Sequence, residues 1–92
     1  FLVDVVLELD LAPAGTSDDL ARTVDYGAVF GAVRAVVEGP HVALLETLAE
    51  RIAAAVLDGA RLAGSVTVRV RKPEAPLPGD LAWAGVEIRR SR

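Results

Sequence analysis

A short alternating stretch, residues 65–72, constrains the fold of this chain more than any other. It reads SVTVRVRK, which places three valines on one face of an extended strand and hydroxyl or guanidinium side chains on the other. Lys72 shares the parity of the valines, and Pro73 then ends the ladder because proline lacks an N–H donor. The stretch therefore predicts a half-buried strand that presents a lysine where the strand becomes a loop.

Two further segments show the same alternation. Residues 1–11 alternate cleanly, with three acidic side chains beside Leu2 and Val6 on one face of the strand. The other face is entirely apolar, with Phe1, Val3, Val5, Leu7, Leu9 and Leu11. Residues 84–89 alternate again, after a loop that is rich in proline. The first pattern is already in phase at Phe1, and no initiator methionine precedes it, so we expect further residues before Phe1 in the natural protein.

Two segments between these strands follow the 3.6-residue period of a helix. The first begins after Thr23 and Asp25, which both offer capping oxygens, and ends at a Gly-Pro pair. The second, about 43–57, ends at an Asp-Gly pair. Residues 12–19, APAGTSDD, are predicted to be a connector with proline and glycine as helix breakers. The apolar helix positions are Tyr26, Val29, Phe30, Val33, Val36 and Val37, then Leu45, Leu48, Ile52 and Val56.

The order of these elements predicts a single α+β domain over residues 1–92. An antiparallel sheet would carry two helices packed on one face, with the core between the two layers. The composition agrees with a core of small aliphatic side chains, since 52% of the residues are hydrophobic but only 4% are aromatic. The opposite sheet face is predicted to be wet and of mixed charge, with Asp4, Glu8, Asp10, Thr67, Arg69, Arg71, Glu87 and Arg89.

The composition also limits the possible chemistry. The 13 acidic and 10 basic side chains give a net charge of -3, which argues against a nucleic-acid partner. Cysteine is absent and His41 is the only histidine, so we expect no thiolate chemistry, no disulfide, no cysteine-based zinc site and no histidine cluster. The glycines match neither the P-loop nor the dinucleotide-binding pattern, and we expect no cofactor. The longest apolar runs are too short to span a membrane, and we expect a cytoplasmic protein without a membrane partner.

Three side chains stand out as candidates for chemistry. Lys72 is a candidate acid or base at a rigid strand end, although its long stem equally allows the ammonium to reach water. Glu46 lies early in the second helix, where the helix dipole favours a carboxylate and where two oxygens can accept a planar, guanidine-like edge. Tyr26 offers either a hydroxyl for proton transfer or a ring for core packing. The residues alone leave these alternatives open.

Three segments, taken together and in this order, resemble a known family. They are TVDYGAVF at 23–30, LLETLAERIA at 44–53 and VRVRKPEAPLPG at 68–79. The sequence is similar to the bacterial dihydroneopterin aldolases of the folate pathway, and the similarity extends over essentially all 92 residues. One segment alone is modest evidence, whereas three in the family order with matching strand and helix phase are specific.

The resemblance implies a tunnelling fold and a pterin substrate. In such a fold, subunits join their antiparallel sheets into an oligomeric barrel with the helices outside, typically rings of four stacked into a homo-octamer. The implied reaction is retro-aldol cleavage of 7,8-dihydroneopterin into 6-hydroxymethyl-7,8-dihydropterin and glycolaldehyde, with neither a metal nor a Schiff base. Sites at subunit interfaces would make assembly a condition of activity.

The resemblance also implies roles for individual residues. Lys72 is similar to the family's catalytic lysine, which moves the proton of the side-chain hydroxyl through water. Tyr26 resembles the tyrosine that helps to reprotonate the enol intermediate. Glu46 resembles the anchor that accepts hydrogen bonds from the 2-amino and ring N–H groups of the pterin, assisted by the Leu45 backbone. The positions that contact the pterin from the neighbouring subunit are matched by Thr23 and Val24.

Two departures from the family pattern keep other functions open. The family begins with another strand and a loop that carries a glutamate near the site, and this chain starts after both. Ala43 replaces the common asparagine before the Leu-Leu-Glu segment, which puts a polar contact from that position in doubt. The alternatives are 2′-epimerisation of dihydroneopterin or its triphosphate, oxygenation of the pterin, and a non-catalytic pterin-binding oligomeric module.

Overall fold

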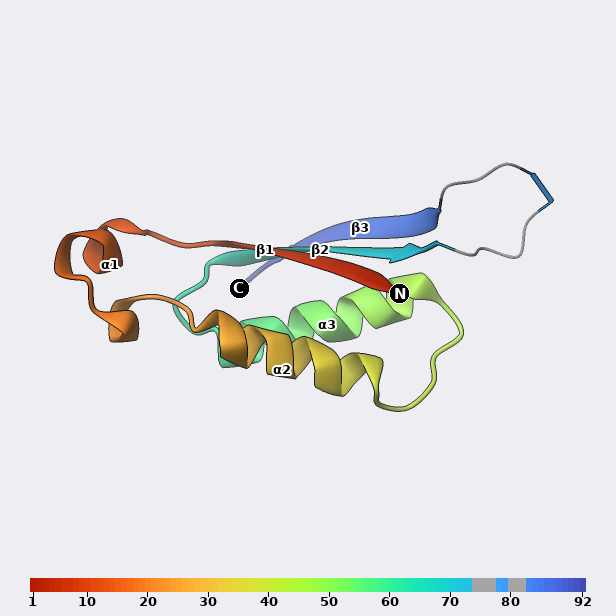
Figure 1. Cartoon of the computed structure of the whole chain (residues 1–92), viewed down its shortest axis with the longest axis horizontal. Coiled ribbons are helices and arrows are strands. Elements are labelled where there is room, and N and C mark those ends of the chain that lie inside the picture. The colour runs from red at the N-terminus through yellow and green to blue at the C-terminus, as the bar shows by residue number, and fades with distance from the viewer. Residues whose placement is uncertain (74–77, 80–82) are drawn as a thin grey trace.

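The computed structural model describes residues 1–73, 78–79 and 83–92, and its elements follow the predicted order (Figure 1). The sheet is antiparallel throughout, with the strand order β1-β2-β3. The predicted α+β arrangement with helices on one side of an antiparallel sheet is therefore confirmed. The elements are β1 (Leu2–Glu8), α1 (Ala12–Ser17), the 3-10 helix η1 (Leu20–Arg22), α2 (Tyr26–Val37), α3 (Leu45–Gly59), β2 (Ser65–Lys72) and β3 (Ala84–Ser91).

The central strand β2 has the predicted parity. Val66, Val68 and Val70 are all 0% exposed and face the helices. The ladder with β1 begins at Leu2 opposite Arg71, and the ladder with β3 begins at Lys72 opposite Ala84. Both flanking strands alternate in the same phase, because their apolar residues are half-buried on the helix side. The period of two in the sequence thus fixes which face of the sheet becomes the core.

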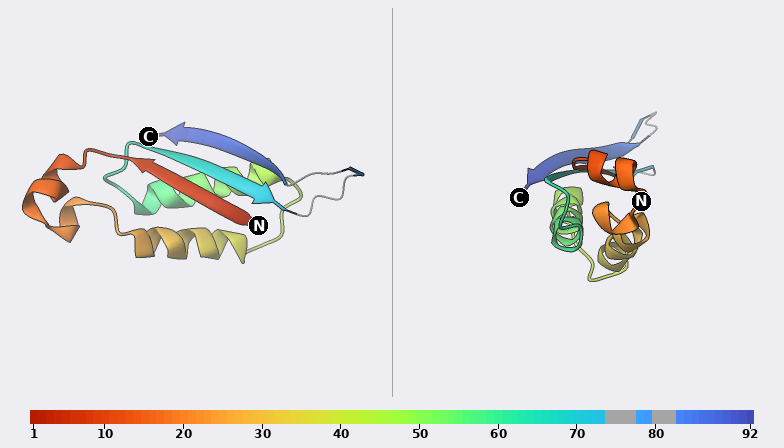
Figure 2. Two further views of the ribbon diagram at one scale, coloured as in Figure 1. Left: turned by 45° about the horizontal axis from the view of Figure 1, so that its top comes forward. Right: turned by 90° about the vertical axis from the view of Figure 1, so that its left-hand side faces the viewer.

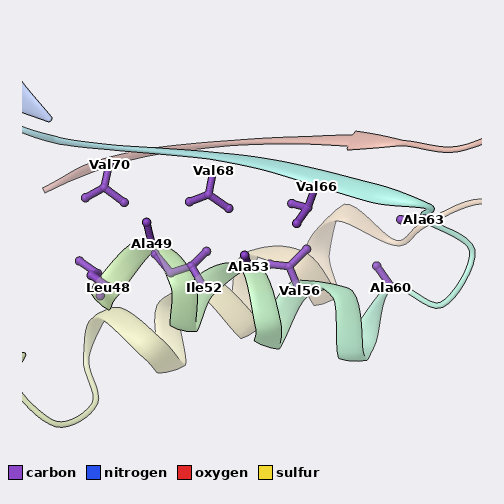
Figure 3. Packing of buried hydrophobic residues seen from close by; sticks show 10 residues of the cluster. All are labelled: Leu48, Ala49, Ile52, Ala53, Val56, Ala60, Ala63, Val66, Val68 and Val70. Atoms are coloured by element: carbon purple, nitrogen blue, oxygen red, sulfur yellow. The ribbon is translucent and has the colours of Figure 1, made fainter. Parts of the chain in front are cut away.

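Helix α3 supplies the other half of the core (Figure 3). Its apolar stripe lies directly against the β2 valines, and the short side chains of Ala49 and Ala53 allow a close approach between helix and strand. Helices α2 and α3 lie on the same face of the sheet, as Figure 2 shows from two further directions. The fully buried helix residues are Leu48, Ala49, Ile52, Ala53 and Val56.

The opposite sheet face carries ion pairs that cross between the strands. Glu87 accepts a hydrogen bond from Arg69 Nη2 at 2.7 Å, and Glu8 accepts one from Arg89 Nε at 3.1 Å. The pKa of the Glu8 carboxyl is lowered by its hydrogen bond and charge interaction with Arg89, with a further hydrogen bond to Ser65. The predicted mixed-charge face is therefore a ladder of opposite charges, which the cross-strand spacing of neighbouring side chains allows.

Helix α2 lies on α3 and is far less buried. Its N-cap is Asp25, whose side chain accepts a hydrogen bond from the Gly27 N–H at 2.8 Å. Thr23, the other predicted cap, instead ends η1. The predicted apolar stripe splits, because Val29, Val33 and Val36 pack against the core whereas Phe30 is 67% and Tyr26 is 88% exposed. Core packing of Tyr26, one of the two interpretations left open by the sequence, is therefore wrong.

The connector predicted over residues 12–19 is also wrong in part, because it contains α1. Pro13 lies in the first turn of this helix, where its missing N–H removes no intrahelical bond. The Ser17 hydroxyl donates to the Pro13 carbonyl, and the helix ends at Asp18 in the left-handed region, with φ 55°. Pro13, which was predicted to break a helix, thus lies in the first turn of one.

Candidate active site

Lys72 lines a cavity at one end of the molecule. It is the last residue of β2, and the parity of the strand directs it to the side that carries the helices. The cavity has a volume of about 130 Å³ and lies where β2 ends beside the start of α3. Lys72 itself is exposed, so its ammonium meets both the cavity and solvent. The cavity is lined by Phe1, His41, Val42, Ala43, Leu44, Leu45, Leu48 and Lys72.

The start of α3 brings the predicted binding residues to the same end. Leu45 is the first residue of the helix and lines the cavity with Lys72, and Glu46 follows it in the first turn. Leu44, at the N-cap, makes no side-chain capping bond, so within the described residues the first N–H groups of this turn have no side-chain cap. The positive end of the helix dipole also favours the Glu46 carboxylate. This end of the folded molecule therefore combines the Lys72 cation, the Glu46 carboxylate and the N–H donors of the helix start.

Thr23 and Val24 lie at the start of α2 and line a different cavity. That cavity has a volume of about 300 Å³ and is bounded by the last turn of α3 and the link that follows it. Both side chains are half-buried. The residues that line it are Thr23, Val24, Asp25, Ala28, Val29, Ala32, Val56, Gly59, Ala60, Arg61 and Leu62.

Tyr26 lies beside them, in an open groove between α2 and β1. The groove has a volume of about 480 Å³ and is mainly apolar, with Phe30 among its lining side chains. Tyr26 is 88% exposed, so its hydroxyl is accessible to a molecule that binds from outside. The start of α2 thus presents a hydroxyl next to the Thr23 and Val24 cavity.

The structure brings Lys72, Leu45 and Glu46 to one end and places Thr23, Val24 and Tyr26 at the other. The start of α2 and the start of α3 lie at opposite ends of the helical layer, as Figure 1 shows. The 12 residues of α2 alone span about 18 Å at the helical rise per residue. A pterin-sized molecule cannot contact both groups within one chain. The six predicted site residues therefore lie in two separate groups, and we call them the lysine half-site and the tyrosine half-site.

The sequence did not single out several cavity residues. His41 was not predicted to belong to the site, yet it lines the same cavity as Lys72. Val42 lies there too, because the link between α2 and α3 passes the end of β2. Their position just before the Leu-Leu-Glu segment was the available signal. Within residues 1–73, 78–79 and 83–92 no group of three or more potential metal-ligating side chains occurs.

Two arginines outside both half-sites have raised pKa values. The Arg69 guanidinium has its pKa raised by the hydrogen bond and charge of Glu87, and that of Arg90 is raised by its hydrogen bond to Glu50. Both pairs are exposed at the surface. The described helices include none that is long and apolar enough to cross a membrane.

The protein is a small α+β domain with an antiparallel sheet and its helices on one face. A lysine and the start of a helix lie together at one end of it. The model of the dihydroneopterin aldolase family matches residues 1–89. The chain therefore belongs to the dihydroneopterin aldolase family, and both the predicted family and the predicted aldolase activity are confirmed.

Individual relatives are similar to this chain over 97% or more of its length. A dihydroneopterin aldolase of Streptomyces coelicolor is 52% identical over 92 residues, which are 100% of this chain and 76% of the relative. The crystal structure of the Escherichia coli dihydroneopterin aldolase in complex with neopterin has a TM-score of 0.86 at 31% identity, over 97% of this chain and 75% of that one. A dihydroneopterin aldolase from Burkholderia thailendensis bound to guanine has a TM-score of 0.81 at 33% identity, over 98% and 73%.

Proposed function

We propose that the lysine half-site and the tyrosine half-site together bind 7,8-dihydroneopterin and cleave it by a retro-aldol reaction. The observation that carries this proposal is the placement of Lys72 and Leu45 in one cavity, with Glu46 next along α3, in a chain of this family. The products would be 6-hydroxymethyl-7,8-dihydropterin and glycolaldehyde.

Glu46 would anchor the pterin ring. Its two carboxylate oxygens match the 2-amino group and the adjacent ring N–H, which form a planar pair of donors. The neopterin and the guanine bound by the two related structures both carry this edge. The N–H groups at the start of α3 would donate to ring acceptors, with the Leu45 backbone nearest to Glu46. Binding at this position would direct the pterin side chain toward the cavity that Lys72 lines.

Lys72 would transfer the proton of the side-chain 2′-hydroxyl through water. As that O–H is deprotonated, the bond between C1′ and C2′ breaks, C2′ becomes the aldehyde carbon of glycolaldehyde, and the electron pair passes into the C6–N5 imine of the ring. The resulting enol is protonated at C1′, which gives the hydroxymethyl product. Proton transfer by positioned side chains of this kind contributes about 10²–10⁴-fold to a rate.

The tyrosine half-site would come from a neighbouring subunit. Tyr26 would assist protonation of the enol, and Thr23 and Val24 would cover the pterin ring. One chain holds these residues at the opposite end from Lys72, which supports a site built across an interface. The single neighbour of β1 and of β3 within the described sheet supports joining of sheets into a barrel. The assembly proposed is a ring of four, stacked into an octamer.

Product analysis tests this function. The protein is incubated anaerobically with 7,8-dihydroneopterin, and the products are separated by chromatography, alongside Lys72→Ala and the matched surface variant Arg51→Ala. We expect both products from the wild type and from Arg51→Ala, and a loss of about 10²-fold or more in Lys72→Ala with pterin binding retained. Formation of the 2′-epimer alone would favour an epimerase, and binding without turnover would favour a non-catalytic module.

A further inference from the structure

The guanidinium of Arg71, on the charged face of the sheet, contacts β1 on one side and the residue just before β3 on the other. Its Nη2 donates to Asp4 of β1 at 2.8 Å. On the other side its central carbon lies 5.6 Å from the centroid of the Trp83 ring, which is within the range of a cation–π contact. Arg71 therefore ties β2 both to β1 and to the residue that precedes β3.

Gly85 makes this arrangement possible. It lies directly opposite Arg71 in the ladder between β2 and β3. A Cβ atom built at Gly85 would lie 2.5 Å from the Val70 carbonyl oxygen, and 3.1 Å from both Arg71 Cγ and Trp83 Cζ3. The carbonyl oxygen belongs to the backbone and cannot rotate away, so a larger residue here would push the strands apart. The cation–π contact between the Trp83 ring and the Arg71 guanidinium thus depends on glycine at position 85.

These contacts lie beside Lys72. Arg71 precedes Lys72 in β2, and Ala84, which pairs with Lys72, follows Trp83. Successive side chains of a strand point to opposite faces, so Arg71 lies on the charged face while Lys72 lies on the side of the cavity. The contacts of Arg71 are therefore made by the residue next to Lys72, on the face of the sheet opposite the cavity.

We propose that Trp83, Arg71 and Gly85 form a strand-end clamp that positions Lys72 for proton transfer. The proposal rests on the function proposed above. A lysine side chain has four rotatable bonds, so the direction in which it leaves the backbone decides where its ammonium can reach. Misplacement of a catalytic group by about 1 Å can cost about 10²-fold in rate. The clamp residues are positioning residues, since they hold the backbone that carries Lys72.

Variants at Trp83 test the clamp in the full, assembled protein. Trp83→Leu keeps apolar bulk but removes the ring face, whereas Trp83→Phe keeps a ring face. We expect Trp83→Leu to lower kcat by about tenfold and to change KM by less than about twofold, because the lysine is displaced while Glu46 still binds the pterin. Trp83→Phe is expected to keep at least about half of kcat. Gly85→Ala is a second variant, expected to lower kcat in the same way.

The matched control is Arg89→Gln. Arg89 is another ion-paired arginine of the same sheet face, but it lies opposite Thr67, toward the other end of β2. We expect its kcat to equal that of the wild type. A lower melting temperature with unchanged kcat in Trp83→Leu would overturn the proposal, since it would show a purely structural role. Equal losses in Trp83→Leu and Trp83→Phe would also overturn the role of the ring face.

A second readout separates this proposal from the function on which it rests. If the wild type gives no product from 7,8-dihydroneopterin, the proposed function fails by itself. Hydrogen exchange at the amides of residues 70–72 and 84–86 then tests the clamp directly. Faster exchange there in Trp83→Leu than in the wild type, but not in Arg89→Gln, supports the clamp, and equal exchange in all three proteins overturns it.

Discussion

The two long helices follow one another in the chain but are buried to different extents. Helix α3 has five residues that are at most 5% exposed, whereas α2 has no buried residue and leaves Phe30 67% exposed. Helix α3 lies against β2, and α2 packs on α3 while a groove remains between α2 and β1. The difference indicates that α3 mainly stabilises the fold, and that α2 keeps apolar surface and the tyrosine half-site available to other molecules.

The largest expected effect on stability comes from helix α3, which supplies the buried residues of the core. Ile52 is 0% exposed and lies against the β2 valines, so Ile52→Ala removes buried methyl and methylene groups and leaves a cavity. We expect the free energy of unfolding to fall by about 3–4 kcal/mol. Denaturant unfolding at a fixed protomer concentration measures this change.

Val33→Ala on α2 is the variant for comparison, although valine loses two carbon atoms where isoleucine loses three. Val33 is half-buried and borders the groove, so its truncation removes less buried area and leaves less of a closed cavity. We expect a loss of about 1 kcal/mol. Equal losses of unfolding free energy in Ile52→Ala and Val33→Ala would show that α2 and α3 contribute alike to stability. That result would contradict the difference between the two helices.

The smallest expected effect lies on the charged face, away from both helices. Because Arg89 lowers the pKa of Glu8 below its ordinary value of 4.5, this pair stabilises the fold above that pH. The contribution is lost as the pH falls through the lowered folded value, where the carboxyl is protonated in both states. We expect Glu8→Gln to have a slightly lower melting temperature than the wild type at neutral pH, and we expect this difference to shrink as the pH is lowered below 4.5. A difference that persists unchanged at the lower pH would contradict this.

The sequence predicted the sheet and the role of α3 because both depend on simple periods. Alternation at β2 fixed the buried valines, and the 3.6-residue stripe fixed Leu48, Ile52 and Val56 as core residues. The unequal burial of α2 could not be predicted, since a helical stripe shows which face is apolar but not which element covers it. The short helix α1 was missed because Pro13 was interpreted as a breaker, although the first helical turn tolerates proline.

The candidate site was predicted as a set of residues but not as an arrangement. The resemblance supplied Lys72, Glu46 and Tyr26, whereas their separation follows from the opposite placement of the two helix starts. The Trp83 contact was missed as well, because Arg71 and Trp83 are distant in the sequence and meet only through the register of β2 with β3.

The central claim is that one active site combines half-sites from two chains, and complementation tests it most directly. Lys72→Ala and Tyr26→Phe, each expected to be nearly inactive alone, are coexpressed with different tags and purified as mixed oligomers. At a one-to-one ratio, half of the chains carry an intact lysine half-site and half an intact tyrosine half-site, so about one quarter of the sites are restored.

A coexpressed pair of Lys72→Ala and Glu46→Gln provides the control, because both defects lie in the lysine half-site. The account predicts aldolase activity near one quarter of the wild type for the first pair and no recovery for the second. A first pair that stays as inactive as its parents, in oligomers shown to be mixed, would contradict the shared site.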